Sequence, residues 1–249
     1  MSQAVNVVQL KPRTLAAFET YIRDAEAAMG PGLRGDRSFL WTDLNSERAN
    51  KVRKGEIVAA FWSGEKPIEV PNGLIHDWSG AAFLATAKVQ AVLAMVQNYD
   101  NHKNIYKPEV MDSRLLHRDG NDFQIFLRLL KKKIITVVLD TDHDVHYQAL
   151  DPARWFCRSY TTRIAEVEDA GTEKEKVLEP DTGYGFLWRL YSYWRFMERD
   201  EGVYVECRAV SLTRDIPLGL AWIIEPIIRK LPKESLIHTL QATRDGLRA

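Results

Sequence analysis

The sequence predicts an α+β fold in which an antiparallel sheet curves around a helix at the C-terminus. Two neighbouring segments, 186–196 and 203–212, alternate large apolar or aromatic residues with others, as strands do. Turn residues at 200–202 separate them, and a long helical tail follows the second segment. A sheet curled around a helix encloses apolar space. This layout therefore favours a site for a hydrophobic ligand over a site built on catalytic side chains.

The composition is that of an ordinary globular protein and argues against several classes of partner. Of the 249 residues, 45% are hydrophobic and 27% are charged, and the formal net charge is zero. A neutral chain lacks the basic surface that binds nucleic acid, so no such partner is expected. No apolar run reaches the ~20 residues of a membrane span, and the first residues lack the basic start of a signal peptide. We expect a soluble protein, cytoplasmic as given or exported as a mature form whose signal has been removed.

The two cysteines, Cys157 and Cys207, are expected to be buried free thiols. Each lies in a predicted strand, and the strand around residue 190 lies between them in the sequence. If consecutive strands pair, two inter-strand spacings of ~4.8 Å separate the sulfur atoms, which is too far for a disulfide bond.

Residues 1–72 are predicted to form an N-terminal extension that packs on a main domain at 73–249. A helix is predicted over 11–29, with Pro12 in its first turn and the glycine-rich segment 30–35 at its end. A second helix over 45–54 has a cap at Asn45 or Ser46 and a stop at Gly55, and a strand follows over 56–62. The apolar residues that require this packing are Phe18, Ile22, Phe39, Trp41, Phe61 and Trp62.

The main domain is predicted to be a seven-stranded antiparallel sheet with its helices on one face. A strand over 74–84 comes first, and a helix over 86–98 follows with the buried stripe Val89, Val92, Leu93 and Val96. Six more strands are predicted at about 109–117, 122–131, 134–149, 154–168, 184–199 and 202–213. The last helix, at about 233–247, turns Leu236 and Leu240 toward the sheet.

Two segments give this order a family resemblance. The sequence YDNHKNIYKPEV at 99–110 follows the first main-domain helix, and GVYVEC at 202–207 precedes Ile216-Pro217. With the order of elements, they resemble the START-like (SRPBCC) superfamily over about residues 74–249. That superfamily shares the helix-grip fold among lipid-transfer START domains, plant pollen-allergen proteins, coenzyme-Q-binding proteins and polyketide cyclases. The resemblance implies an apolar cavity between the curved sheet and the C-terminal helix, without naming a ligand.

The densest polar segment, 140–146, suggests a metal site, but strand geometry argues against one. Alternate strand residues share a face, so the three aspartates of the segment and His146 lie opposite His143. The two histidines then point in opposite directions and cannot ligate one ion. We expect a solvated acidic face and no bound metal.

His143 continues the apolar face of Val137 and Leu139, so we expect it to point into the cavity. Three interpretations stay open for it. It is a buried histidine satisfied by the protein, a polar anchor for a ligand hydroxyl or carbonyl, or a general acid–base.

The strand at 184–199 is predicted to place its even-numbered residues inward and Tyr191, Tyr193 and Arg195 outward, with Ser192 as the polar contact. The strand at 154–168 shows no clean alternation, and one of its arginines is expected to reach the interior and meet an anionic partner. The expected cavity residues are Val137, Leu139, His143, Trp188, Leu190, Ser192, Trp194, Phe196, Leu236 and Leu240.

Several motifs that would indicate catalysis are absent from the sequence. It has no glycine-rich phosphate loop, no Gly-x-Ser-x-Gly elbow and no Cys-x-x-Cys pair, so no catalytic residue and no cofactor is predicted. The basic run at 128–133 is either a solvated hairpin or a contact for a lipid headgroup. The apolar segment 217–232, interrupted by Gly219, Pro226 and Pro232, is either a static linker or a lid that touches a membrane or a partner when open.

Three functions fit these patterns. The first is a non-enzymatic binding protein or carrier for a hydrophobic small molecule or lipid, with possible transient membrane contact. The alternative is a cyclase or isomerase that acts on a polyketide-like substrate in the same cavity. The third is a structural or partner-binding module whose cavity is filled by its own side chains. The first is favoured because no triad, metal set or carboxylate pair assembles on the inward faces.

Overall fold

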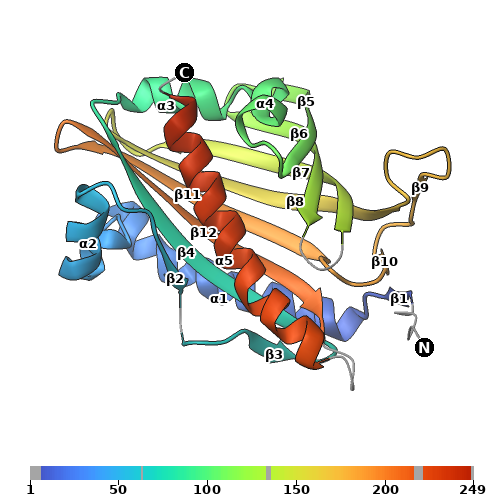
Figure 1. Ribbon diagram of the computed structural model, residues 1–249. Coiled ribbons are helices and arrows are strands. Elements are labelled where there is room, and N and C mark those ends of the chain that lie inside the picture. The colour runs from blue at the N-terminus through green and yellow to red at the C-terminus, as the bar shows by residue number, and fades with distance from the viewer. Residues whose placement is uncertain (1–6, 63, 133–135, 216–220, 248–249) are drawn as a thin grey trace.

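The computed structural model describes residues 7–62, 64–132, 136–215 and 221–247, with 221–230 as helical backbone only (Figure 1). The helices are α1 Pro12–Arg34, α2 Ser46–Arg53, α3 Val89–Val96, α4 His102–Ile105 and α5 Ala221–Gly246, with short 3₁₀ turns at Thr42–Leu44 and Tyr99–Asn101. The strands are β1 Val8–Gln9, β2 Val58–Phe61, β3 Ile68–Val70, β4 Gly73–Ala85, β5 Val110–Asp119, β6 Asp122–Lys132, β7 Thr136–Ala149, β8 Arg154–Glu168, β9 Lys176–Val177, β10 Thr182–Gly183, β11 Arg189–Arg199 and β12 Gly202–Arg214.

One antiparallel sheet dominates the fold. Its strands follow the order β2-β4-β12-β11-β8-β7-β6-β5, and the short β3 and β9 pair with β4 and β8. The seven long strands are those predicted from the sequence. The first of them, β4, pairs along its whole length with the last, β12. Figure 1 shows α5 crossing one face of the sheet and α1 lying on the opposite face.

Both long helices extend beyond the predicted limits, because each continues through prolines at which the sequence predicts a helix break. Pro31 lies inside α1, and the helix ends only before Gly35, whose φ of 88° places it in the left-handed region that glycine favours. Helix α5 begins at Ala221, twelve residues before the predicted start, and runs through Pro226 and Pro232. Proline removes one backbone hydrogen bond, but the other bonds of the helix continue on both sides of it.

The predicted lid over 217–232 falls largely outside the described residues. Residues 216–220 are not described, and for 221–230 only the helical backbone is. The choice between a lid and a static linker therefore stays a prediction.

The smaller elements follow local sequence signals. The side-chain oxygen of Asn45 accepts the backbone N–H of Arg48 at 2.8 Å, which caps α2. Gly55, with a φ of 90°, follows the end of that helix. In the two-residue turn between β11 and β12, Asp200 and Glu201 both have positive φ, as a type I′ hairpin requires.

Helix α5 touches the sheet at a glycine. A Cβ atom on Gly80 would lie 2.8 Å from Leu240 Cδ1 and 3.0 Å from Leu236 Cγ. Both leucines therefore face the sheet, as the sequence predicts, and Gly80 lets the helix approach β4 closely.

We expect Gly80→Ala to lower the free energy of unfolding by about 1–3 kcal/mol, because the added methyl group overpacks the contact with α5. Urea denaturation measures this loss. Gly30→Ala in α1 is the matched control, since its methyl group would meet only the end of the Arg34 side chain. Equal effects of the two substitutions would contradict the close approach at Gly80.

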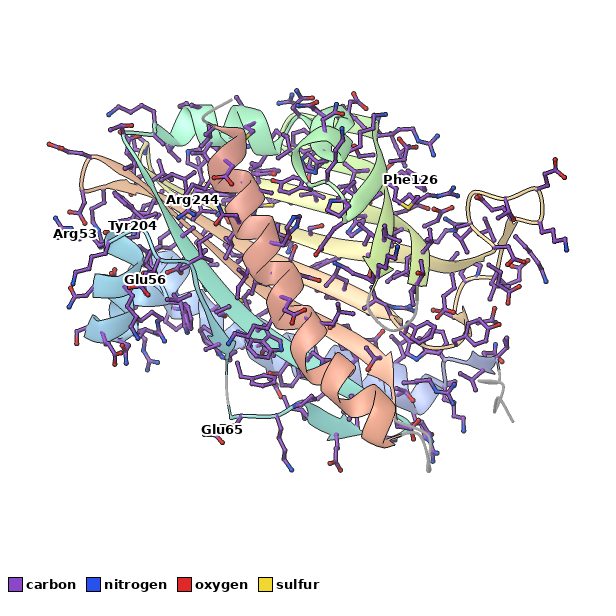
Figure 2. All side chains as sticks on the ribbon, viewed as in Figure 1. Arg53, Glu56, Glu65, Phe126, Tyr204 and Arg244 are labelled. Carbon is purple, nitrogen blue, oxygen red and sulfur yellow. The ribbon has the colours of Figure 1, made fainter. Side chains whose placement is uncertain are left out.

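The N-terminal segment covers the outer face of the sheet, opposite α5. Phe18 and Ile22 of α1 pack there against Tyr193 and Leu212. In Figure 2, Tyr204 lies toward α2, while Arg244 extends from α5 on the other face. Strands β2 and β3 also precede residue 73, yet both pair with β4 in the main sheet. The sheet therefore crosses the predicted boundary at residue 72.

Buried polar groups join this segment to the sheet. The Tyr21 hydroxyl donates to Asp77 Oδ2 at 2.6 Å, and Asp77 forms an ion pair with Arg208 at 2.5 Å. The Glu206 carboxylate accepts the backbone N–H groups of Trp41 at 2.7 Å and Thr42 at 2.8 Å. Buried polar groups need such partners, so these contacts fix where the segment sits on the sheet.

Within the described residues, no helix combines the length and the apolar character that a membrane span requires.

Candidate functional site

A cavity of about 380 Å³ lies between α5 and the inner face of the sheet. Its wall takes residues from the long strands, from the region around α4, from the segment 184–187 and from α5. Most of these side chains are apolar. The volume falls in the range of ~300–1,000 Å³ that is typical of ligand sites.

The structure brings most of the predicted cavity residues together. The following lie on the wall: Val137, Leu139, His143, Leu190, Ser192, Trp194, Phe196 and Leu236. On β11, Tyr193 packs against α1 on the outer face, and Arg195 pairs in register with Glu206 there. The inward and outward faces of 190–196 are therefore as predicted.

Trp188 is a correction, because it lies on the outer face with Phe18 and Leu212. The ladder of β11 begins only at Arg189, so strand alternation does not extend back to Trp188. The neighbouring Leu187 lines the cavity instead.

Leu240 is a second correction. It is fully buried, but it packs where α5 meets β4 at Gly80, and this contact leaves no space. Of the two predicted leucines on α5, Leu236 reaches the cavity and Leu240 does not.

The missing alternation in β8 has a structural cause. The register between β7 and β8 shifts between Asp142 and His143. Asp142 pairs with Arg163, while the next residue, His143, pairs with Thr161. Thr162 is therefore an extra residue, and such a bulge exchanges the two faces of a strand. None of the three arginines of this strand lines the cavity, and the arginine on its wall is Arg214 of β12.

His143 is held by a chain of hydrogen bonds inside the cavity wall. The Thr141 hydroxyl donates to the carbonyl oxygen of Leu127 at 3.0 Å, so it accepts the Nε2–H of His143 at 2.9 Å. The Ser159 hydroxyl lies 3.3 Å from the remaining nitrogen, Nδ1, and donates to it. Burial lowers the pKa of His143 to about 4. The ring is therefore neutral near pH 7, with both nitrogens bonded by the protein.

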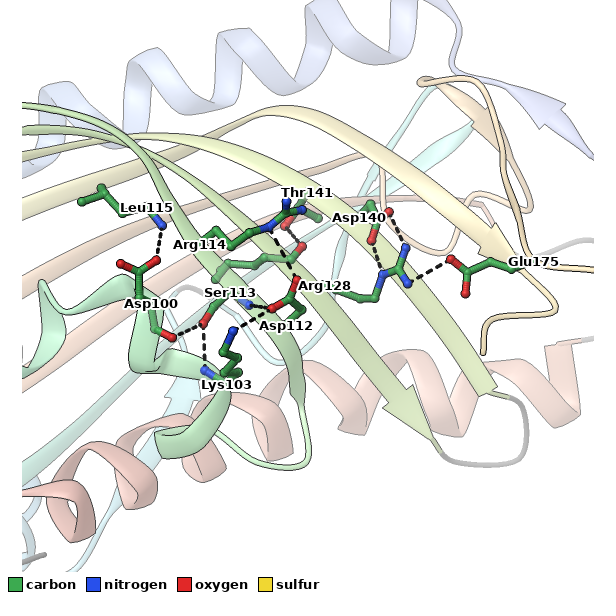
Figure 3. A network of polar contacts seen from close by, with 11 residues as sticks. Asp100, Lys103, Asp112, Ser113, Arg114, Leu115, Arg128, Asp140, Thr141 and Glu175 are labelled. Atoms are coloured by element: carbon green, nitrogen blue, oxygen red, sulfur yellow. Dashed lines mark hydrogen bonds and ion pairs between the residues drawn. The ribbon is translucent and has the colours of Figure 1, made fainter. Parts of the chain in front are cut away.

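The acidic face of β7 points away from the cavity, as expected, but it is less solvated than predicted. Asp140 is only 6% exposed and accepts two hydrogen bonds from Arg128, at 2.7 and 2.9 Å. Arg128 also pairs with Glu175 at 3.0 Å (Figure 3). A cross-strand arginine thus compensates the buried carboxylate.

Figure 3 also shows how the α4 region is fastened to β5 by polar contacts. The Asp100 carboxylate accepts the backbone N–H of Leu115 at 2.9 Å. The Ser113 hydroxyl accepts the backbone N–H of Lys103 at 2.9 Å, and the Lys103 ammonium pairs with Asp112 at 3.1 Å. These contacts hold Tyr99 and His102, which line the cavity, against the sheet.

Two tyrosines and two cysteines form a buried part of the wall that the sequence did not indicate. The hydroxyl oxygens of Tyr99 and Tyr147 are 2.9 Å apart, and burial raises the pKa of both well above the ordinary value. Cys157 and Cys207 are buried free thiols on either side of Trp194, so β11 separates them as predicted. Burial raises the pKa of each thiol, so neither is a reactive thiolate.

His76 also lies on the wall, and sequence reasoning missed it. It lies on β4 directly opposite Ser211 of β12, and its Nε2 is 3.1 Å from Thr213 Oγ1. Burial lowers its pKa to about 4. The signal that was available is the alternation of β4, which places His76, Trp78 and Ala82 on one face.

Two basic side chains on the wall, Lys131 and Arg214, are engaged by polar groups of the protein. The Lys131 ammonium contacts the Glu109 carboxylate and donates to Ser235 Oγ of α5 at 2.7 Å. The Arg214 guanidinium donates to the carbonyl oxygen of Tyr184 at 3.2 Å. These pairs tie α5 and the segment 184–187 to the sheet.

The segment 184–187 is fixed by a buried carboxylate. Glu166 accepts the backbone N–H groups of Tyr184 at 2.7 Å, Gly185 at 2.9 Å and Phe186 at 3.1 Å. A Cβ atom on Gly183 would lie 2.7 Å from this carboxylate, so glycine is needed for the close approach.

Among the described residues, no three histidine, cysteine or carboxylate side chains lie close enough together to hold a metal ion. The cavity wall offers mostly apolar surface, together with neutral imidazoles and hydroxyl groups. Such a surface solvates an uncharged apolar molecule and orients it through a few hydrogen bonds.

Comparison with known proteins gives matches at the level of structure alone. No protein-family model matches the chain. No curated protein matches its sequence either. The Zhui aromatase/cyclase from Streptomyces sp. R1128 matches with a TM-score of 0.50 and 11% identity, over 70% of this chain and 94% of that one.

The chain has the helix-grip fold of START-like proteins. Two other helix-grip structures match less well. A STAR-related lipid transfer protein fragment from Xanthomonas axonopodis has 17% identity and a TM-score of 0.49, over 74% of this chain and 98% of that one. Human STARD10 has 8% identity and a TM-score of 0.43, over 72% of each chain. At 11% identity, the likeness to the aromatase/cyclase shows the fold alone.

Proposed function

We propose that this protein binds a hydrophobic small molecule or lipid in its internal cavity and carries it without chemical change. One observation supports this above the others: a cavity of about 380 Å³ that is lined mostly by apolar side chains, with His76 and His143 neutral near pH 7. The open space supports this proposal over the third function considered, a structural or partner-binding module whose cavity is filled by side chains. Transient contact with a membrane during loading belongs to the same proposal.

The proposal is tested by what the purified protein carries. Native mass spectrometry, followed by organic extraction, should reveal a bound apolar compound of a size that fits the cavity. Ala209 lines the cavity beside Ser192 on the neighbouring strand, so Ala209→Phe should fill the space and abolish the bound compound. Ala60→Phe, on the exposed side of β2, is the matched control. If Ala209→Phe still carries the compound, the ligand binds elsewhere. If neither the unaltered protein nor Ala60→Phe carries a compound, and neither takes one up from added lipid, the carrier function is rejected.

A cyclase or isomerase is the second candidate, and one observation favours it. Ser159 Oγ lies 3.3 Å from His143 Nδ1 on the cavity wall, the arrangement of a hydroxyl beside a general base. The low pKa of His143 makes it a weak base near pH 7, which is why we rank this function second. If an extracted ligand changes its mass or retention on incubation with fresh protein, and Ser159→Ala prevents the change, the protein is an enzyme.

A further inference from the structure

The three buried histidines of the cavity differ in how their ring nitrogens are satisfied. His143 has both nitrogens bonded by threonine and serine hydroxyls. His102 bonds the carbonyl oxygen of Val96 through Nε2 at 2.9 Å. His76 is fully buried, yet its Nδ1 has no hydrogen-bond partner among the residues that the structure describes.

The bonding around His76 fixes what Nδ1 can do. The Thr213 hydroxyl donates to the carbonyl oxygen of Arg214 at 3.2 Å, so it accepts a proton from Nε2 of His76 at 3.1 Å. A neutral imidazole that is protonated on Nε2 carries a lone pair on Nδ1. The unpartnered atom is therefore a hydrogen-bond acceptor, and an acceptor buried without a donor costs free energy.

A second polar group lies beside this acceptor. Ser211 is the direct cross-strand neighbour of His76 and is 8% exposed. Its hydroxyl forms no hydrogen bond within the described parts of the chain. Both residues line the cavity, so one ligand group could contact the two together. A hydroxyl group suits this pair, since it can donate to His76 and also accept from Ser211.

The charges on the wall favour the same class of ligand. A carboxylate has no proton to donate to Nδ1, and the imidazole itself is uncharged because burial lowers its pKa. Both cations of the wall are already engaged: Lys131 by Glu109 and Ser235, and Arg214 by the carbonyl oxygen of Tyr184 and the negative charge of Glu166. A fatty-acid anion would therefore enter this part of the cavity without a matching charge.

We propose that the His76–Ser211 pair binds the hydroxyl group of an otherwise apolar ligand, so the cavity selects uncharged alcohols or phenols over carboxylates and over analogues without a hydroxyl. This inference rests on the proposed ligand-binding function and narrows its chemistry. The rest of the ligand lies against the apolar side chains of the wall.

Three matched probes test the proposal by isothermal titration calorimetry: 1-decanol, decyl methyl ether and decanoate. The ether keeps the oxygen but has no proton to donate. We expect decanol to bind about tenfold more tightly than the ether, the effect of one well-formed hydrogen bond in a dry site. Decanoate should bind more weakly than decanol.

Variants separate the head-group contact from general binding. His76→Phe should bind decanol and the ether equally, because it removes the acceptor and keeps an apolar ring. Ser211→Ala is the smaller change and should also reduce the preference for decanol over the ether. It provides the test if His76→Phe does not fold. His117→Phe, at an exposed position of β5, is the matched control and should keep the full preference.

The following results would each overturn the proposal. If decanol and the ether bind the unaltered protein equally, or if His76→Phe and Ser211→Ala keep the preference, the cavity binds ligands but this pair does not select them. Stronger binding of decanoate would replace the alcohol class with an anionic one. If none of the three probes binds, the ligand-binding function fails and the inference fails with it.

Discussion

Lowering the pH from 7 to 4 is expected to remove up to about 10 kcal/mol from the free energy of unfolding, through three buried histidines. Burial lowers the pKa of His76, His102 and His143 to about 4, from an ordinary value of 6.5. Between these two pH values the unfolded chain binds a proton at each histidine and the folded chain does not. The stabilising contribution is therefore complete above pH 6.5 and is lost as the pH falls to 4, at about 3 kcal/mol for each histidine.

Urea denaturation at a series of pH values between 4 and 8 measures this dependence. The slope of the free energy of unfolding against pH should correspond to nearly three protons near pH 5. Replacing any one of the three with Gln should lower the slope by about one proton. A free energy that stays constant from pH 6.5 to 4.5 would contradict the neutral, buried state of these rings.

The same burial has a functional consequence. A charged imidazole in the cavity would repel apolar ligands and would demand an anionic partner. Because the folded chain keeps these rings neutral, the wall combines apolar character with hydrogen-bonding groups. Acidic conditions that protonate them would weaken the fold and the ligand site together.

Strand alternation predicts the cavity well where the ladder is regular. On β7, His143 lies on the inner face with Leu139, and on β11 Trp194 and Phe196 do the same. It fails at Trp188, one residue before the ladder begins, and in β8, where a bulge at Thr162 exchanges the faces. Neither a strand limit nor a bulge has a clear local signal, because both are set by how neighbouring strands pair.

Contacts between distant segments were beyond sequence reasoning. His76 and Ser211 are separated by most of the main domain and become neighbours only because β4 pairs with β12. The same pairing places Asp77 near Arg208 on the outer face. A lone histidine or aspartate in a predicted strand gives no sign of such a partner, so the polar groups that specify a ligand or fix an interface emerge only in the folded structure.

Removing Arg208 is expected to destabilise the protein by about 3–5 kcal/mol, because it leaves a buried charge without its partner. Arg208 and Asp77 are each 2% exposed and lie 2.5 Å apart. In Arg208→Met the Asp77 carboxylate would keep one strong donor, the Tyr21 hydroxyl of α1 at 2.6 Å. The double variant Asp77→Leu/Arg208→Met should be less destabilised than the single one, since it buries no unpaired charge.

This ion pair also tests whether the N-terminal segment is docked on the sheet, as we propose. Arg199→Met is the matched control, because Arg199 pairs with Asp43 at a more exposed site and should contribute less than about 1 kcal/mol. Urea denaturation measures the stabilities, and limited proteolysis follows release of residues 1–57. Arg208→Met should speed that release, because the buried Asp77 carboxylate between α1 and the sheet loses its cationic partner. Arg199→Met should leave the release slow. If the segment is cut as quickly in the unaltered protein as in Arg208→Met, α1 is not held by this buried layer and the docking proposal fails.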